Sequence, residues 1–180
     1  MAKVHFFYST MNAGKSTALL QSAHNYHETG NETILFIPRE DAERNSGLIK
    51  SRIGLSASAI VIDSKLKIFE YVQKEVVKRQ VDAILVDEAQ FLKKHHVLQM
   101  CKICDELEIP VMCYGIRTDF RGELFEGSGS LLALADNLIE LKTVCNECSK
   151  KATMVVRLDE NGKVVTKGSK VQIGGNDVYR

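Results

Sequence analysis

One segment near the start of the chain has the composition of a phosphate-binding loop. Residues 9–17 match the pattern G-x-x-x-x-G-K-[ST], except that Ser9 replaces the first glycine. In such a loop, successive backbone N–H groups surround a phosphate at the N-terminus of a helix. Gly14 allows close approach of the backbone, Lys15 reaches the β- and γ-phosphates, and Ser16 supplies a hydroxyl to Mg²⁺. The predicted ATP and magnesium site consists of Ser9, Thr10, Met11, Asn12, Ala13, Gly14, Lys15, Ser16 and Thr17.

A pair of acids follows the most apolar segment of the chain, residues 83–86. In a fold with a phosphate loop, Asp87 at this place can hold Mg²⁺ through water, and Gln90 is assigned to the same nucleotide site. Glu88 then faces the point where the transferred phosphoryl group meets its acceptor. A carboxylate there accepts a proton either from water, as in an ATPase, or from a substrate hydroxyl, as in a kinase. The motif alone does not choose between the two.

The five cysteines divide into two groups. Cys101 and Cys104 fall on the apolar stripe of a predicted helix and Cys113 lies in a predicted strand, so these three are interpreted as packing residues. Cys145 and Cys148 lie among polar residues after a predicted strand, as the thiols of a zinc knuckle do. A redox pair or idle thiols are the alternatives, because no second Cys or His pair follows before Arg180.

The elements that must position these residues alternate between short apolar runs and longer amphipathic runs. Strands are predicted at residues 3–8, 33–37, 59–62, 83–86, 111–114 and 137–141. Helices are predicted at residues 15–27, 66–79, 94–107 and 131–135, with Asp63 or Ser64 as the cap of the second. Strand and helix in alternation indicate βαβ units. The predicted fold is α/β, a P-loop, RecA-like parallel sheet with helices on both faces.

Two regions depart from this alternation. Residues 39–58 are charged without clear periodicity, which favours a functional or mobile loop. Near Thr143 the sequence becomes rich in β-formers, and Asn161-Gly162 is a hairpin signal. Two domains follow from this: a nucleotide-binding core at residues 1–142 and a small β-rich module at residues 143–180.

Composition excludes several classes of protein. The chain has 180 residues with ordinary globular composition, enough for one domain with a small appendage. Its 24 Lys and Arg against 23 Asp and Glu leave a net charge of +1, without the basic surplus of proteins that grip nucleic acid. No apolar run reaches the ~20 residues that span a bilayer, and no signal peptide opens the sequence. We therefore expect a cytoplasmic protein that binds neither nucleic acid nor membrane.

Five motifs together resemble one family, the type II thymidine kinases, and among them the bacterial members. The motifs run in order along the chain at residues 11–17, 86–91, 114–125, 140–145 and 173–176. The loop alone is common to many folds, whereas the five in this order are specific.

The resemblance implies that ATP phosphorylates the 5′-hydroxyl of thymidine, or deoxyuridine, to the monophosphate. Glu88 would be the general base, and the thymine ring would lie near Phe91 and Phe120. Asp41 is matched to an acid of the family in the region of residues 39–58. Such enzymes supply nucleotides for DNA synthesis by nucleoside salvage.

The resemblance also implies a C-terminal lasso over the nucleoside, anchored on a structural zinc module. The lasso residues would be Val171, Gln172, Ile173, Gly174 and Tyr179. Cys145 and Cys148 would supply half of the zinc ligands, and the other two are expected beyond Arg180. A homotetramer and feedback inhibition by thymidine triphosphate are carried over as expectations.

Two other functions compete with this one. A RecA-like P-loop ATPase would use the same Asp87-Glu88 pair to activate water. The short chain, the neutral charge and the Cys- and Gly-rich end, which suits a lid over a small ligand, argue against it. A non-catalytic nucleotide-binding regulator with a zinc knuckle for a partner is the second.

Overall fold

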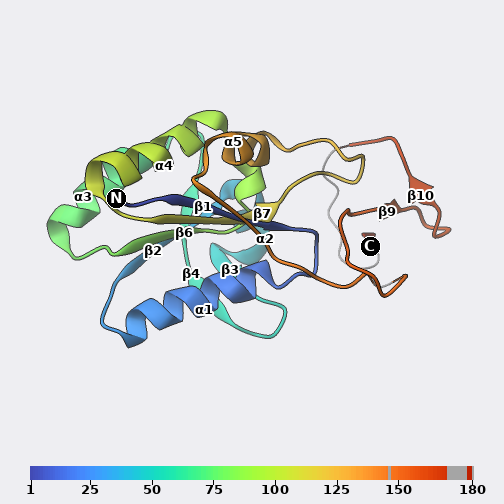
Figure 1. Cartoon of the computed structure of the whole chain (residues 1–180), viewed down its shortest axis with the longest axis horizontal. Helices are drawn as coiled ribbons and strands as arrows, with labels where there is room; N and C mark the ends of the chain where they lie inside the picture. Colours follow the sequence, from blue (N-terminus) through green and yellow to red (C-terminus); the bar gives the residue numbers. More distant parts are fainter. Residues whose placement is uncertain (146, 170–177, 180) are drawn as a thin grey trace.

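A six-stranded sheet forms the centre of the computed structural model, which describes residues 1–145, 147–169, 178 and 179 (Figure 1). All of its pairings are parallel, and the strand order is β5-β2-β6-β7-β1-β8. The strands are β1 (Val4–Ser9), β2 (Thr33–Pro38), β5 (Ile60–Ile62), β6 (Ala83–Val86), β7 (Val111–Ile116) and β8 (Asn137–Glu140). The predicted parallel sheet is confirmed, and each predicted strand agrees with an observed one to within two residues.

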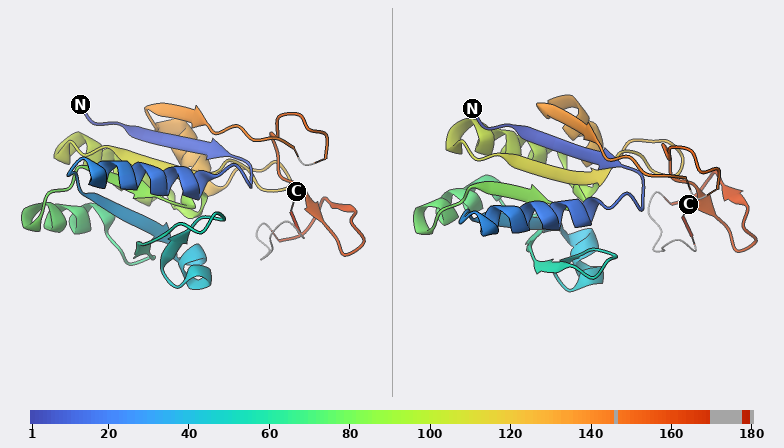
Figure 2. Two further views of the ribbon diagram at one scale, coloured as in Figure 1. Left: turned by 90° about the horizontal axis from the view of Figure 1, so that it is seen from below. Right: turned by 60° about the horizontal axis from the view of Figure 1, so that its bottom comes forward.

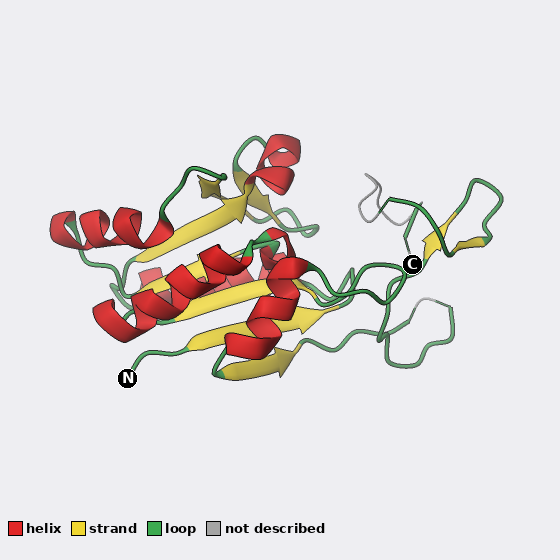
Figure 3. Cartoon of the chain, turned by 90° about the horizontal axis from the view of Figure 1, so that it is seen from above, coloured by secondary structure: helices red, strands yellow, loops and turns green. Residues whose placement is uncertain are grey.

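Helices cover both faces of the sheet, as predicted (Figures 1 and 3). On one face lie α3 (Ile68–Lys78), α4 (Lys94–Leu107) and α5 (Glu126–Leu134). On the other lies α1 (Lys15–Glu28), which crosses in front of the strands in the left view of Figure 2. Two buried clusters fill these interfaces. The apolar stripe predicted within residues 94–107 is confirmed, because Val97 and Cys104 are buried and Cys101 and Leu107 are half-buried against the same cluster.

Strand β6 contributes side chains to the buried clusters on both faces of the sheet. All four of its side chains are fully buried. Ile84 and Val86 belong to the cluster beneath α3, α4 and α5, whereas Ala83 and Leu85 belong to the cluster beneath α1. Alternate side chains of a strand point to opposite faces, so a strand between two helical layers must be apolar throughout. This burial fixes the position of the strand that precedes Asp87.

The prediction of a loop at residues 39–58 is wrong. The segment forms α2 (Arg39–Asn45) and a hairpin of β3 (Leu48–Lys50) and β4 (Ser56–Ser58). Ala42 and Ile49 are the buried residues among those described in this segment, so little hydrophobic periodicity was available to indicate either element.

Two helix boundaries also differ from the prediction. Helix α5 begins at Glu126, five residues before the predicted start at Leu131, because Gly127 and Gly129 weaken the helical signal. Helix α3 begins at Ile68 with Lys67 as its N-cap residue. Asp63 instead accepts hydrogen bonds from the backbone N–H groups of Lys65 (2.9 Å) and Leu66 (2.8 Å), in the turn before the helix.

The C-terminal segment extends beyond the carboxyl ends of the strands (Figures 1 and 2). Its predicted hairpin is confirmed: β9 (Arg157–Leu158) pairs antiparallel with β10 (Val164–Val165). Asp159 Oδ1 accepts hydrogen bonds from the backbone N–H groups of Asn161 and Lys163, each at 2.9 Å, and so closes the turn. Within the described residues, no helix combines the length and apolarity needed to cross a bilayer.

Candidate active site

The phosphate loop connects the end of β1 to the start of α1. Two of its residues have left-handed backbones, Asn12 with φ of 64° and Gly14 with φ of 71°. Glycine adopts this conformation freely and asparagine visits it more readily than most residues, for which it costs about 1–2 kcal/mol. A Cβ on Gly14 would have no neighbour within 4 Å, so the backbone conformation is what demands glycine in this structure. The short connection turns sharply enough to aim the N-terminus of α1 at the carboxyl edge of the sheet.

Lys15 is buried, and its ammonium group is held by its own loop. Nζ donates to the Thr10 carbonyl oxygen at 2.6 Å and to Ser9 Oγ at 3.4 Å. Burial lowers the pKa of Lys15, while the carboxylates of Glu88 and Asp87 act in the opposite direction. A buried cation next to two acids is the electrostatic arrangement expected where phosphate and metal charges are to be balanced.

Asp87 follows β6 and is only 2% exposed. The Ser16 side chain forms a hydrogen bond with its carboxylate, and Asp87 Oδ1 accepts a further one from the Glu88 N–H at 3.0 Å. Burial, followed by the neighbouring Glu88 carboxylate, raises the pKa of Asp87 to about 7. A hydroxyl and a carboxylate in contact provide the oxygen donors that Mg²⁺ prefers, so these residues fit a magnesium site.

Glu88 has a strained backbone between β6 and the 3₁₀ turn η1 (Ala89–Phe91). Its φ and ψ angles are 46° and 39°, a left-handed conformation that glutamate rarely adopts. The Glu88 carboxylate Oε2 accepts a hydrogen bond from Gln90 Nε2. Strain of this kind persists where surrounding contacts enforce it, and it is concentrated in functional sites.

Most of these residues line a single cavity of about 400 Å³. Its volume lies within the range of small-molecule sites. The lining includes the loop from Met11 to Thr17, the acids Asp41 and Glu88, and Gln90, Phe91 and Tyr179. Ser9 and Thr10 instead line a small neighbouring hollow together with Tyr8 and Arg117.

Sequence reasoning missed part of this lining. The additional residues are Lys50, Ser51, Arg52, Ile53, Ile116 and Phe125. Four of them lie in or beside the β3–β4 hairpin, in the segment predicted to be a loop. The one sequence feature that could have indicated structure in this segment was its length, because long stretches without secondary structure are uncommon inside a compact domain.

The three phenylalanines near the site have different surroundings. Phe91 and Phe125 meet edge to face, with ring centroids 5.8 Å apart, and both line the cavity. Phe120 is mostly buried beneath the Arg157 guanidinium, which lies 3.9 Å from its ring centroid. In the described part of the chain, the cavity lining does not include Phe120.

The C-terminal segment reaches this cavity through Tyr179. The Leu158 N–H donates to the Val178 carbonyl oxygen at 2.8 Å, and Arg157 and Tyr179 form an isolated antiparallel bridge. The other residues assigned to the lasso, Val171, Gln172, Ile173 and Gly174, lie outside the described residues.

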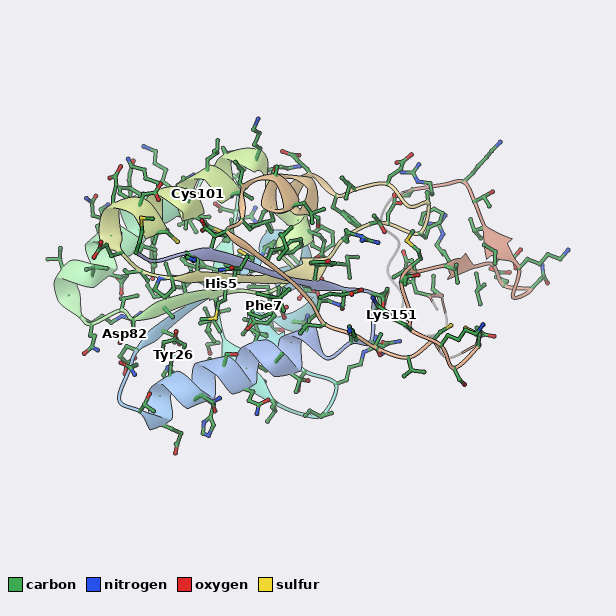
Figure 4. The ribbon with its side chains drawn as sticks, viewed as in Figure 1. His5, Phe7, Tyr26, Asp82, Cys101 and Lys151 are labelled. Carbon is green, nitrogen blue, oxygen red and sulfur yellow. The ribbon has the colours of Figure 1, made fainter. Side chains whose placement is uncertain are left out.

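The two groups of cysteines lie far apart. Cys101, Cys104 and Cys113 are half-buried or buried between α4 and β7, and Figure 4 places Cys101 on α4. Cys145 and Cys148 occupy the turn closed by the bridge between Val144 and Lys151.

The turn at Cys145 suits a thiolate. The Glu147 N–H donates to Cys145 Sγ at 3.4 Å, and this bond, with others from Cys148, lowers the pKa of Cys145. These two thiols fit one half of a zinc site. No third candidate ligand joins them within the part of the chain that the structure describes, so the predicted zinc module is not confirmed.

Comparison with known proteins decides the family. The sequence profile described as thymidine kinase matches residues 2–180. The chain belongs to the thymidine kinase family. Family membership makes it a kinase, as the motifs had indicated.

Curated thymidine kinases match over nearly the whole chain. The thymidine kinase of Zymomonas mobilis is 51% identical over 99% of this chain and 92% of its own length. Those of Salmonella choleraesuis and Haemophilus influenzae are each 50% identical over 99% of this chain, and over 87% and 92% of their own lengths. Among solved structures, a Pif1 helicase from Candida albicans aligns with 80% of this chain and 37% of its own at 15% identity. Its TM-score is 0.46, too low to support an argument about function.

Proposed function

We propose that this thymidine kinase transfers the γ-phosphoryl group of ATP to the 5′-hydroxyl of thymidine or deoxyuridine. The observation that carries the proposal is the shared cavity, in which the Glu88 side chain lies together with the phosphate loop from Met11 to Thr17. A carboxylate beside a phosphate loop is placed to take a proton from an acceptor hydroxyl.

In this reaction Glu88 accepts the proton of the 5′-hydroxyl as its oxygen attacks the γ-phosphorus and ADP leaves. Lys15 and the N–H groups of the loop neutralise the charge on the phosphates. Bound Mg²⁺ would be held by Ser16 and Asp87 and would supply further charge neutralisation. Phosphoryl transfer needs mostly positioning and charge compensation, which a buried lysine and a rigid loop provide.

The nucleoside is proposed to occupy the side of the cavity formed by Phe91, with Tyr179 and the lasso residues Val171, Gln172, Ile173 and Gly174 over it. The observed edge-to-face contact of Phe91 with Phe125 supports an aromatic wall for the base. Phe120 lies beneath Arg157. Its proposed effect on the base is therefore indirect, through the C-terminal segment that contains Arg157. Asp41 lines the same cavity and is a candidate for a sugar hydroxyl.

The division into a core at residues 1–142 and a lid module at residues 143–180 is part of the proposal. It is supported by the extension of residues after Thr143 beyond the sheet (Figure 1). A structural Zn²⁺ on Cys145 and Cys148, with two further ligands from outside this sequence, would fix the base of that module.

Family membership supports three further expectations. The enzyme is proposed to be a cytoplasmic homotetramer, to act on free nucleoside without nucleic acid or membrane as a partner, and to be inhibited by thymidine triphosphate.

A nucleoside panel tests the proposed reaction against simple ATP hydrolysis. With γ-labelled ATP and Mg²⁺, label is expected on the 5′-monophosphate of thymidine, and also of deoxyuridine. Formation of ADP should depend on the nucleoside. Label found only as free phosphate, at a rate independent of nucleoside, would support the ATPase and contradict the kinase.

A further inference from the structure

Gln90 is 2% exposed and lies between the candidate base and the end of β7. Its Nε2 donates to Glu88 Oε2, and its Oε1 accepts a hydrogen bond from the Ile116 backbone N–H at 3.1 Å. Both polar atoms of the side chain therefore have partners within the protein. One partner is the carboxylate that is proposed to do the chemistry, and the other is fixed backbone of the central sheet.

Chemistry determines the orientation of this amide. An N–H group can only donate, so the atom facing the Ile116 N–H must be the amide oxygen. The NH₂ group then faces Glu88, where an ionised carboxylate can only accept. Reversing the amide would place donor against donor at one end and acceptor against acceptor at the other. Gln90 thus connects the sheet to Glu88 in one direction only.

The neighbouring backbone leaves space for this side chain and little more. A Cβ added to Gly115 would lie 2.8 Å from Gln90 Oε1 and 3.0 Å from the Gln90 backbone nitrogen. Any other residue at position 115 would displace the amide. The Ile116 carbonyl oxygen accepts a hydrogen bond from Ser128 Oγ at 2.6 Å, which anchors the far end of the connection to α5.

We propose that Gln90 is a positioning residue, which holds the Glu88 carboxylate at the reacting hydroxyl through its hydrogen bond and is itself fixed by Ile116 and Gly115. The proposal rests on the proposed function, in which Glu88 is the general base. It differs from the sequence-based assignment of Gln90 to the nucleotide, because the contacts of the side chain lead to Glu88 and to the sheet.

The main test replaces Gln90 by methionine, which preserves the length of the side chain and removes both hydrogen bonds. We expect kcat for thymidine to fall about 100-fold, since a displaced catalytic group costs a factor of this order. The KM values for ATP and thymidine should stay within about threefold. A KM for ATP that rises tenfold with kcat retained would overturn the proposal in favour of a nucleotide contact. Full kcat with unchanged KM values would overturn it as well.

A matched control is Gln99→Met. Gln99 also joins two backbone groups, accepting from the Phe69 N–H at 3.1 Å and donating to the His95 carbonyl oxygen at 3.3 Å, but it lies between α3 and α4. We expect this variant to lose stability without losing kcat. A comparable loss of kcat in both variants would mean that general loosening of the fold explains the effect of Gln90→Met.

Two more variants keep the test decisive if Gln90→Met folds poorly. Gln90→Glu keeps the acceptor for the Ile116 N–H but places a second buried carboxylate against Glu88, so kcat per folded enzyme should fall at neutral pH and the melting temperature should fall as well. In a Glu88→Gln background, Gln90→Met should lower the residual rate by less than about threefold, because the two residues act as a unit. Independent losses that multiply would contradict a role through Glu88.

The wild-type enzyme separates the two proposals. If it does not phosphorylate thymidine, the proposed function fails. If it does, and Gln90→Met and Gln90→Glu are both fully active, only the positioning role of Gln90 fails.

Discussion

Glu88 combines three properties of a catalytic group at the scale of a single residue. Its backbone is left-handed, its carboxylate is hydrogen-bonded, and its side chain lines the cavity. The residues flanking it, Asp87 and Ala89, are both buried. Since packing fixes both neighbours, the strained conformation at Glu88 is enforced by the surrounding fold.

Replacing Glu88 by glutamine should separate binding from chemistry. The amide keeps an oxygen that can accept from Gln90 and loses the ability to take a proton. We expect kcat to fall by about 10²–10⁴-fold with ATP affinity nearly unchanged. Steady-state kinetics and titration with a non-hydrolysable ATP analogue measure the two effects. Glu75→Gln on α3, far from the cavity, is the matched control, and unchanged turnover in Glu88→Gln would remove the base from the mechanism.

The cysteines should differ sharply in reactivity. Burial raises the pKa of Cys104 to about 12 and also raises the pKa of Cys113, whereas the N–H of Glu147 lowers the pKa of Cys145. The thiolate is the reactive form and Cys148 is exposed, so a thiol reagent at pH 8 should modify Cys145 through its lowered pKa and Cys148 through its accessibility before the buried thiols. Mass spectrometry of the labelled peptides identifies the order. Added Zn²⁺ should slow labelling at these two positions, and equal labelling of Cys113 in the folded protein would contradict the prediction.

At the scale of elements, α5 and η1 pack together unusually closely. A Cβ on Gly127 would lie 2.4 Å from the Ala89 carbonyl oxygen and 2.8 Å from that of Leu92. Glycine at this point brings the start of α5 against the turn that follows Glu88. Helix α5 therefore supports the active site from behind, through backbone contact.

Two glycines in α5 provide an internal comparison. Gly127→Ala forces α5 and η1 apart and should destabilise the fold by about 1–3 kcal/mol, with loss of kcat. Gly129→Ala meets nothing closer than Leu124 at 3.8 Å and should stabilise the helix by about 0.5–1 kcal/mol. Thermal denaturation and steady-state kinetics of both variants are the measurements. Equal effects would show that the close approach at Gly127 is unimportant.

Sequence patterns predicted the elements whose burial is periodic or continuous. Strand β6 and helix α4 agree with prediction to the residue, because one is wholly apolar and the other has a clear buried stripe. Because β1 and β6 were both predicted as parallel strands, Asp87 and Glu88 could be placed at the same end of the sheet as the loop after β1.

What could not be predicted depends on contacts between distant segments. The β3–β4 hairpin buries little of its own surface, so no pattern placed Lys50 and Arg52 in the cavity lining. Nor could the sequence show that Gln90 faces Glu88 and Ile116, since that arrangement depends on the approach of η1 to Gly115.

At the scale of the whole molecule, Arg157 connects the C-terminal segment with the rest of the chain. It lies over Phe120 and donates to the carbonyl oxygens of Ser169 at 2.8 Å and Lys167 at 3.1 Å. It is 5% exposed although it carries a charge, so these contacts compensate for its burial.

Arg157→Met should loosen this segment while the sheet stays intact. We expect the KM for thymidine to rise severalfold and the KM for ATP to change less, because the lid is proposed to cover the nucleoside. Limited proteolysis should cut after residue 143 faster than in the wild type. Lys163→Met, an exposed change in the same hairpin, should do neither, and equal KM changes for both substrates would contradict a lid specific to the nucleoside.

Because every pairing in the sheet is parallel, the N-terminal ends of all its strands lie along one side of the sheet and their C-terminal ends along the opposite side. Met1 lies on the side of the N-terminal ends, whereas the cavity and the C-terminal segment lie at the opposite end (Figure 1). Tethering the enzyme to a bead or sensor chip through its N-terminus would therefore leave the catalytic edge facing the solution. A tether attached at Tyr179, which lines the cavity, would instead crowd the site.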